Sequence, residues 1–412
     1  MSEIDACRLC GSSQLEEVLD LGEQCLTGVF PPSSDHEVTA GRLRLVKCHS
    51  DGGCNLVQLD RSFDPGEMYG DNYGYRSGLN QSMVRHLQDV VHLAEELVAP
   101  TDADVILDIG SNDGTTLSLY RGEALFKYGM DPTAAKFEGY YDSRSTPIAD
   151  FFSADRFLAA SEARKAKVVT SLSMFYDLED PLAFARDVAR VLDDQGIWIL
   201  EQSYLPSMLE TVSYDTICHE HVEYYALEQI EWIVDQCEME VVRVDLNDVN
   251  GGSFLLVVQK RGGPLSVDKS VDQVREAERS LRLDTLEPFR QFEKQVAHNI
   301  RALKQFLEAA RQNAERVVAF GASTKGNVVL QAAGINREAI DCVGDVNPDK
   351  YGCVTPGSKI PIVAEDELLS SDFDYALVLP WHFRQFFDSS DRFSSVNLVY
   401  AHPVLDIRRA LT

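Results

Sequence analysis

Short apolar runs alternate with longer helical stretches between residues 104 and about 260, and this alternation constrains the fold more than any other feature of the sequence. The apolar runs cover residues 105–109, 168–170, 196–200 and 254–258, and a helical pattern over 181–192 separates two of them. Continuous apolar runs are typical of strands that are buried on both faces, as in parallel sheets. The pattern therefore predicts a doubly wound α/β domain.

A second α/β pattern begins near residue 315, with apolar runs at 316–320, 340–343 and 375–379. One or two long charged helices are predicted before it, over 268–313, and another helix within 66–100. A chain of 412 residues is too long for a single core. We expect a small module at 1–65, an α/β domain at 66–265, and a second Rossmann-like α/β domain with its leading helices at 266–412.

The net charge of -28 argues against two classes of partner. An acidic surface repels nucleic acid and anionic membranes, so we expect neither to bind. No apolar run reaches the roughly 18 residues of a membrane span. Residues 1–9 lack the basic and apolar pattern of a secretion signal. We expect a cytoplasmic protein, and the sequence leaves open whether it is a monomer or a homodimer.

Cysteines gather at the N-terminus. Cys7 and Cys10 form a CxxC pair, and Cys48 and Cys54 form a looser pair further along. Clustered cysteines without a secretion signal are typical of a metal site, and four thiolates suit a structural Zn²⁺. A small loop-rich module buries little apolar surface, so a bound metal would supply the stability that a hydrophobic core gives to a larger domain. The alternative ligands are His49 and Cys25.

A glycine loop follows the first apolar run of the α/β domain. It reads D-x-G-x-x-x-G, and its predicted cofactor contacts are Asp108, Gly110, Ser111, Asn112 and Gly114. A dinucleotide loop would have glycine in place of Asn112, so the pattern favours the S-adenosylmethionine loop of class I methyltransferases over a nicotinamide fold. Further predicted contacts, placed by spacing, are Asp131 for the ribose hydroxyls, Asp150 and Phe151 for adenine, and Ser171 just after the next strand.

Residues 219–225 pack two histidines, two glutamates and two tyrosines together. Adding a methyl group to carbon needs an enolate, so a base must remove a proton beside a carbonyl. Histidine suits that role because its ordinary pKa is near neutral, and a neighbouring glutamate would orient the ring. The alternatives are a metal site at His219 and His221, or a structural histidine pair.

The loop from Gly321 to Gly326 follows an apolar run and opens a helix. Free N–H groups at a helix N-terminus favour an anion, and Lys325 adds a positive charge. We interpret this loop as a cradle for a pyrophosphate or a sugar, and the alternative is an ordinary strand-to-helix turn. Trp381 and His382 follow a later strand, at the edge where ligands of parallel sheets bind, although both residue types are equally common in cores.

Together these motifs resemble a known family, the C-methyltransferases that act on nucleotide-linked keto-deoxysugars. The resemblance covers essentially the whole chain. Besides the cysteines and the glycine loop it rests on Tyr73-Gly-Tyr75-Arg-Ser77, His219-Glu-His221 with Tyr224-Tyr225, Asn250-Gly-Gly-Ser253, Gly321-Ala-Ser-Thr-Lys-Gly-Asn327, Asp345-Val-Asn-Pro348 and Pro380-Trp-His-Phe383.

The resemblance implies a structural zinc, S-adenosylmethionine in the middle domain, and a nucleotide-diphosphate sugar between the middle and C-terminal domains. It implies that His221 removes the proton alpha to the keto group, that Glu220 positions His221, and that the resulting enolate attacks the methyl sulfonium. Tyr75 or Tyr73 is expected near the sugar. The other implied substrate contacts are Tyr225, Asn250, Ser323, Lys325, Asn327, Trp381 and His382.

Two positions depart from the family pattern. Cys218 stands where a member of the family has tyrosine, and Asn250 stands where histidine often precedes the glycine pair. Both changes remove a proton-carrying group near the expected sugar, so the sugar and the methylated carbon stay open. The alternative functions are an epimerase or an O-methyltransferase on the same substrates, or a non-catalytic nucleotide-sugar-binding protein. The intact donor loop favours the C-methyltransferase over the epimerase, and His221 with Glu220 argues against the non-catalytic protein.

Overall fold

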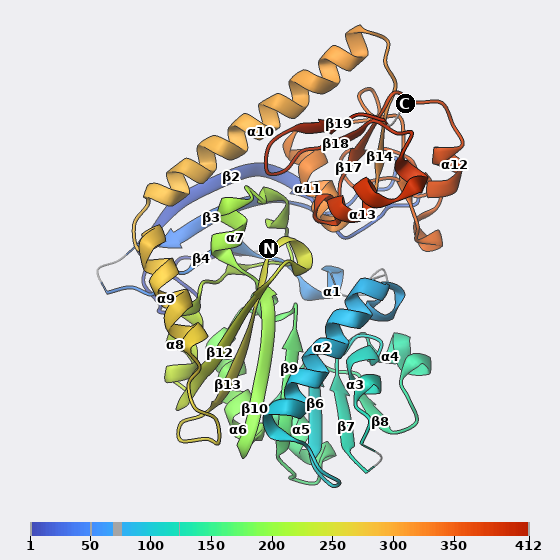
Figure 1. Cartoon of the computed structure of the whole chain (residues 1–412). Helices are drawn as coiled ribbons and strands as arrows, with labels where there is room; N and C mark the ends of the chain where they lie inside the picture. Colours follow the sequence, from blue (N-terminus) through green and yellow to red (C-terminus); the bar gives the residue numbers. More distant parts are fainter. Residues whose placement is uncertain (1, 50–51, 69–75, 123, 411–412) are drawn as a thin grey trace.

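A seven-stranded sheet forms the middle part of the chain, in the lower half of Figure 1. The computed structural model describes residues 2–49, 52–68, 76–122 and 124–410. The strand order is β12-β13-β10-β9-β6-β7-β8, and neighbours are parallel except that β13 is antiparallel to β10 and β12. The strands are β6 (Val105–Ile109), β7 (Phe126–Met130), β8 (Ser145–Ile148), β9 (Ala166–Leu172), β10 (Leu192–Ser203), β12 (Met239–Asn247) and β13 (Ser253–Lys260). The predicted α/β fold of this part is confirmed.

Helices cover both faces of this sheet, because alternate residues of each strand point to opposite sides. Leu107, Val169 and Trp198 pack in one buried cluster, and Ile106, Val168 and Ile197 pack in another. The second cluster is covered by α2 (Gln81–Val98) and α3 (Thr115–Leu119). The first is covered by α5 (Ala154–Ala160), α6 (Pro181–Val191), α8 (Leu227–Asp235) and α9 (Lys269–Leu281). The short helices α4 (Ala134–Phe137) and α7 (Leu205–Glu210) lie beside the sheet's loops.

Helix α9 packs with the middle sheet. Val271 and Val274 lie in the same buried cluster as Trp198, and the Glu278 carboxylate accepts hydrogen bonds from the Tyr204 hydroxyl (2.8 Å) and the Leu227 amide (2.7 Å). The predicted boundary at residue 266 groups this helix with the C-terminal domain, whereas its buried contacts are with the middle sheet.

The N-terminal part forms a four-stranded antiparallel sheet in the order β11-β4-β3-β2. Its strands are β2 (Leu15–Cys25), β3 (Ala40–Cys48), β4 (Val57–Leu59) and β11 (Glu223–Tyr224), with a separate pair formed by β1 (Ser2–Glu3) and β5 (Arg61–Ser62), and α1 (Pro65–Met68) after them. Strand β11 comes from the segment that follows His221. The N-terminal sheet is therefore completed by residues far along the chain.

The C-terminal sheet has the order β16-β15-β14-β17-β18-β19, which is the 3-2-1-4-5-6 order of a doubly wound fold. Its strands are β14 (Val317–Phe320), β15 (Val343–Asp345), β16 (Ile362–Ala364), β17 (Tyr375–Val378), β18 (Leu398–Tyr400) and β19 (Asp406–Arg408), and its helices are α11 (Thr324–Ala332), α12 (Glu365–Leu369) and α13 (Arg384–Ser389). Only β19 is antiparallel to its neighbour. The strand predicted at 340–343 begins only at Val343.

Helix α10 (Glu287–Gln312) lies along β2 and reaches the C-terminal sheet (Figure 1). Its buried residues Phe289, Phe292, Leu303 and Leu307 belong to one hydrophobic cluster that includes residues of both the N-terminal and the C-terminal sheets. This shared cluster joins the two parts. Short 3-10 turns complete the fold at η1 (Ser77–Leu79), η2 (Glu138–Tyr140), η3 (Phe175–Asp177), η4 (Tyr214–Thr216), η5 (Val249–Gly251), η6 (Pro348–Lys350), η7 (Trp381–Phe383) and η8 (Asp391–Phe393).

No helix in the described part of the chain has both the length and the hydropathy that crossing a bilayer requires.

Replacing Phe292 with alanine tests the shared cluster under α10. Phe292 is 1% exposed, so we expect Phe292→Ala to cost about 3–5 kcal/mol of unfolding free energy. The measurement is denaturant unfolding followed by fluorescence and by circular dichroism. Phe386, which is 58% exposed on α13, is the control, and Phe386→Ala should change stability by less than about 0.5 kcal/mol. Equal effects of the two changes would contradict this packing.

Candidate active site and metal centre

Four cysteine thiols converge at one end of the N-terminal sheet. The Sγ atoms of Cys7, Cys10, Cys48 and Cys54 lie within 4.8 Å of one another, with 3.5 Å between Cys7 and Cys54 and 3.5 Å between Cys10 and Cys48. A tetrahedral zinc bound by sulfur at about 2.3 Å sets its ligands about 3.8 Å apart. The donor set and its spacing therefore fit Zn²⁺.

The two alternative ligands lie elsewhere. Cys25 ends β2 at the opposite end of the hairpin, where its backbone amide donates to the Gln331 side chain (2.7 Å). The His49 side chain is exposed. Within the described residues, the four predicted cysteines form the one group of three or more possible ligand atoms close enough to share a metal, and it includes neither alternative. The Cys54 thiol also lowers the pKa of Cys7 to about 5, so Cys7 is ready to bind as a thiolate.

The glycine loop after β6 has the backbone that the sequence requires. Gly110 and Gly114 have φ angles of 73° and 72°, in the left-handed region that favours glycine. A Cβ atom at Gly114 would lie 2.8 Å from the Tyr141 ring. The Tyr141 hydroxyl is 2.7 Å from the Ser111 hydroxyl and donates to the Asn112 carbonyl (3.0 Å). Sequence reasoning missed Tyr141, because nothing local in the sequence shows that it folds back onto the loop.

Asp131 ties this loop to the end of β7. Its carboxylate accepts hydrogen bonds from the Asn112 amide (2.9 Å) and from the Thr133 amide and hydroxyl (both 2.6 Å). Asp108 lies deeper, where it accepts from the Thr170 hydroxyl (2.5 Å), and burial raises the pKa of Asp108 to about 7. The structure thus brings together the loop and the carboxylate that the sequence analysis paired by spacing.

The remaining predicted donor contacts have different environments. Asp150 and Phe151 follow β8 next to Asp131, whose amide donates to the Ile148 carbonyl (3.1 Å), and the Phe151 ring is 55% exposed. Ser171 lies within β9 rather than after it. Its side chain is fully buried and accepts a hydrogen bond from the Trp198 indole (2.9 Å). The Ser171 side chain is therefore turned into the core of the sheet.

The two histidines of the 219–221 segment point to different places. The His221 Nδ1 atom lies 2.9 Å from the Thr216 carbonyl oxygen, and the ring packs on Tyr176 with centroids 4.1 Å apart. His219 is fully buried against Phe63, with its Nε2 atom facing backbone carbonyls of the N-terminal sheet. The segment is not a strand here, so the two rings do not form the metal pair considered as an alternative.

The tautomer of His221 follows from its partner. A carbonyl oxygen only accepts, so Nδ1 must carry the hydrogen, and Nε2 keeps a free lone pair in the neutral ring. Burial, and then the Lys325 ammonium, lower the pKa of His221 to about 3, so the ring is neutral at physiological pH. The side chain is only half-buried. His221 therefore has the state of a general base.

Glu220 does not orient this ring. Its carboxylate lies beside the Thr27 and Cys218 side chains, and a Cβ atom at Gly28 would be 2.7 Å from its Oε1 atom. Burial raises the pKa of Glu220. The orienting contact predicted for Glu220 is made instead by the Thr216 carbonyl, which sequence reasoning missed because a main-chain acceptor leaves no mark in the sequence.

The predicted tyrosines do not add to the site in the described residues. Tyr225 is fully buried, where its hydroxyl donates to Glu223 and its ring packs on Phe175. Tyr73 and Tyr75 lie outside the described residues. The predictions for these two positions stay predictions.

The C-terminal loop meets the middle domain at the Asn250 turn. The Lys325 ammonium donates to the Asn250 carbonyl, and the Asn250 amide donates to the Ser173 hydroxyl at the end of β9 (3.3 Å). A Cβ atom at Gly251 would lie 3.1 Å from the Trp381 ring. The carboxyl edges of the two doubly wound sheets therefore face each other here.

The other predicted residues of the C-terminal domain divide into two groups. Trp381 donates to the buried Asp215 carboxylate (2.9 Å), and burial and Lys325 lower the pKa of the half-buried His382 to about 3. These two lie at the seam with Lys325. Ser323 caps α11 by accepting from the Gly326 amide (3.0 Å), and the fully buried Asn327 donates to the Thr27 carbonyl (2.7 Å). Ser323 and Asn327 thus have structural partners in the described state.

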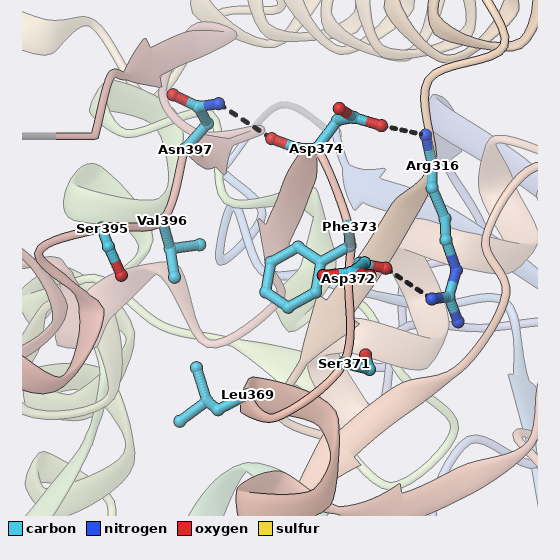
Figure 2. Close-up of a pocket in the computed structure, with 9 residues that line it drawn as sticks. All are labelled: Arg316, Leu369, Ser371, Asp372, Phe373, Asp374, Ser395, Val396 and Asn397. Carbon is cyan, nitrogen blue, oxygen red and sulfur yellow. Dashed lines mark hydrogen bonds between the residues drawn. The ribbon is translucent and has the colours of Figure 1, made fainter. Parts of the chain in front are cut away.

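A surface hollow of about 510 Å³ lies at the other end of the C-terminal sheet, and Figure 2 shows its lining. Its polar groups pair with one another: Asp374 accepts from the Arg316 amide (2.7 Å) and from the Asn397 side chain (2.9 Å). None of the predicted site residues lines it. It lies where β14, β17 and β18 begin, whereas ligands of such sheets bind where the strands end.

Three family models match this chain along most of its length. Residues 7–69 match a putative zinc binding domain, residues 80–244 a methyltransferase domain, and residues 248–395 a C-methyltransferase C-terminal domain. The C-methyltransferase NovU of Streptomyces niveus is 27% identical over 402 residues, which cover 95% of this chain and 94% of that protein.

Solved structures resemble only part of the chain. The plantazolicin methyltransferase BpumL in complex with SAH is 13% identical, over 42% of this chain and 82% of its own, with a TM-score of 0.34. The mitomycin 7-O-methyltransferase MmcR is 14% identical, over 44% and 55%, with a TM-score of 0.35. A likeness this partial supports no inference about the substrate or the site of this chain.

The family models, the glycine loop joined to Asp131 and the cysteine cluster define an S-adenosylmethionine-dependent methyltransferase. The chain carries, in this order, the zinc-binding, methyltransferase and C-methyltransferase C-terminal domains that these family models describe.

Removing one thiol tests the metal centre. We expect the purified protein to hold about one zinc ion per chain and Cys10→Ser to lose most of it, because three thiolates and a hydroxyl hold zinc far more weakly. Metal content is measured by inductively coupled plasma mass spectrometry. Cys353→Ser is the matched control, and Cys25→Ser tests the alternative ligand. Full zinc in Cys10→Ser, or loss of zinc in Cys25→Ser, would refute the assignment.

Proposed function

We propose that this enzyme methylates a carbon atom of a nucleotide-linked keto-deoxysugar. The observation that carries the proposal is the His221 ring, whose Nδ1 donates to the Thr216 carbonyl and whose Nε2 makes no hydrogen bond with any described residue. This neutral base lies at the seam between a methyl-donor domain and a second doubly wound domain. A carbon acceptor requires such a base, since an enolate must be formed before the methyl group can be transferred.

The donor's place follows from the glycine loop. When bound, S-adenosylmethionine supplies an electrophilic methyl group. The loop from Gly110 to Gly114 allows its close approach, the Asp131 carboxylate would accept from the ribose hydroxyls, and the exposed Phe151 ring would pack on adenine. Asp131 retains lone pairs for this purpose, since each carboxylate oxygen accepts more than one hydrogen bond.

His221 would take the proton alpha to the keto group at Nε2. The Thr216 carbonyl then stabilises the imidazolium, because Nδ1–H remains its donor. Burial and Lys325 both weaken this base in the free protein. A diphosphate bound at Lys325 would offset the lysine's charge and so make His221 more basic when substrate is present.

The nucleotide-sugar would lie across the seam. The Gly321–Lys325 loop opens α11 at the carboxyl edge of the C-terminal sheet, where a helix N-terminus and a lysine favour the diphosphate. Asn250, Trp381 and His382 come from either side of the same seam. The four cysteines that would hold zinc lie in the N-terminal module, and a zinc ion bound by all four thiolates would have no open coordination position, so its role would be structural.

The test of this function is an assay with a panel of nucleotide-linked 4-keto-6-deoxysugars and S-adenosylmethionine, run in heavy water and read by mass spectrometry. A product that gains one methyl group on carbon supports the proposal. Deuterium uptake without methylation indicates an epimerase-like reaction, and O-methylation without uptake indicates an oxygen acceptor. Either of these outcomes contradicts it.

Replacing the proposed base should abolish most turnover. We expect His221→Asn to lower the rate of methyl transfer by about 10²- to 10⁴-fold, because asparagine still donates to the Thr216 carbonyl but takes no proton. Rates are measured by product formation at saturating substrates. His298→Asn, at an exposed position of α10, is the control. Near-normal methylation by His221→Asn would rule out His221 as the general base.

Asp131 should matter for donor binding rather than for the proton. We expect Asp131→Ala to weaken S-adenosylmethionine binding about 10- to 100-fold, as for the loss of hydrogen bonds to a charged group. Isothermal titration calorimetry gives the dissociation constant. The control is Asp155→Ala, whose side chain is 81% exposed on α5. Unchanged affinity in Asp131→Ala would exclude Asp131 from the donor site.

A further inference from the structure

Three consecutive residues of the η4 turn, 214–216, link the C-terminal domain to the proposed base. The Tyr214 ring packs on His402, with centroids 4.8 Å apart. The next residue, Asp215, accepts a hydrogen bond from the Trp381 indole (2.9 Å). The carbonyl of the third residue, Thr216, accepts from His221 (2.9 Å). Trp381 and His402 follow the ends of β17 and β18, so the edge of the C-terminal sheet determines where the base lies.

Asp215 is an unusual choice for a residue that only anchors this turn. The side chain is fully buried, and among the described residues its Oδ1 atom has no hydrogen-bond partner. Oδ1 faces the Nε2 atom of His402 at 3.8 Å, which is also without a hydrogen bond. His402 uses Nδ1–H on the Val212 carbonyl (3.0 Å), so its neutral ring presents a lone pair to the carboxylate.

Asparagine would present a complementary atom to both neighbours of this side chain. Its amide oxygen would accept from Trp381, and its amide nitrogen would donate toward His402. A buried carboxylate also costs more desolvation free energy than an amide. Hydrogen bonding and solvation therefore both favour asparagine at position 215, and the retained negative charge calls for another explanation.

The groups that respond to this charge are those of the proposed site. Burial lowers the pKa of Lys325 and of the rings of His221, His382 and His402, and the negative charge of Asp215 opposes that lowering in each of them. For His221, burial and Lys325 act in the opposite direction. When His221 takes a proton, a second positive charge appears near the Lys325 ammonium. A nearby buried carboxylate stabilises that state, because charges interact strongly where water is excluded.

We propose that Asp215 is a positioning residue for His221: its bond to Trp381 fixes the turn that carries the Thr216 carbonyl, and its charge stabilises the imidazolium formed during proton abstraction. This inference rests on the proposed function. The C–H electron pair goes to the enolate, and the proton goes to His221 Nε2.

The decisive variant is Asp215→Asn in the full-length, zinc-loaded enzyme. We expect it to unfold at the wild-type temperature or above, because the amide oxygen keeps the Trp381 bond and an N–H group replaces the oxygen that faces the His402 lone pair. The affinity for S-adenosylmethionine, measured by calorimetry, should not change. Deuterium exchange at the sugar carbon, measured with the keto-sugar that the panel identifies, should slow about 10- to 100-fold, as for a charge effect of one to two pKa units. Asp245→Asn, at a partly exposed ion pair, is the control.

Two results would overturn the proposal. Wild-type exchange in Asp215→Asn would show that the charge is not needed. A joint fall in melting temperature, donor affinity and exchange would show that Asp215 only holds the fold together. Trp381→Phe keeps the charge and removes the anchor, so we expect a lower melting temperature and slower exchange, with donor affinity unchanged. Trp232→Phe, on α8, is its matched control.

A second measurement does not depend on any substrate. Diethylpyrocarbonate modifies neutral imidazoles, and its rate at each histidine is obtained by peptide mass spectrometry. At neutral pH we expect His221 to react several-fold more slowly in Asp215→Asn than in the wild type, relative to the exposed His298, because a less basic ring is a weaker nucleophile. Equal ratios would overturn the role of the charge. If no keto-sugar exchanges a proton with the wild type, the proposed function fails, and this measurement still decides whether Asp215 makes the His221 ring more basic.

Discussion

The segment that carries the proposed base has little regular structure of its own and depends on burial in a shared hydrophobic cluster. Ile217, Cys218 and Val222 flank the two histidines, and all three lie in the cluster that joins the N-terminal sheet to α10 and the C-terminal sheet. Apolar burial is non-directional, so it holds the segment without specifying the ring of His221. The main-chain carbonyl of Thr216 supplies that specificity. The two effects together fix a base between two sheets.

The same arrangement explains how a strongly acidic protein can offer a site for an anion. The net charge of -28 repels a diphosphate at long range, but screening limits that repulsion to about a Debye length. At the seam the local charge is different: the Lys325 ammonium stands at the start of α11, and the rings of His221 and His382 beside it are neutral. Because Lys325 is partly buried, its charge interacts with a ligand more strongly than the surface carboxylates do.

Much of this architecture follows from contiguous sequence patterns. The buried strands, the CxxC pair and the glycine loop are local, and Asp131 lies at a fixed distance along the chain from the loop that it contacts. The contacts that sequence analysis missed are long-range or made by the main chain. Tyr141 folds back over Gly114, and Asp215 meets a tryptophan from the far end of the chain. Adjacent residues of a short motif can also have different roles from those that their types suggest. Glu220 is next to His221 in sequence, yet its carboxylate points to Thr27, because neighbouring side chains of an irregular segment diverge.

The cysteine at position 218, where a member of the family has tyrosine, leaves fewer groups that can carry a proton in the proposed site. The thiol is fully buried in the shared cluster, and burial keeps its pKa well above the ordinary value, so it remains a neutral apolar group. His219 faces the N-terminal sheet and Glu220 faces Thr27. Of the titratable side chains from 218 to 221, His221 alone is at the seam with a free ring nitrogen. In the proposed reaction it must therefore take the proton and later release it, since no second group on this segment can relay it.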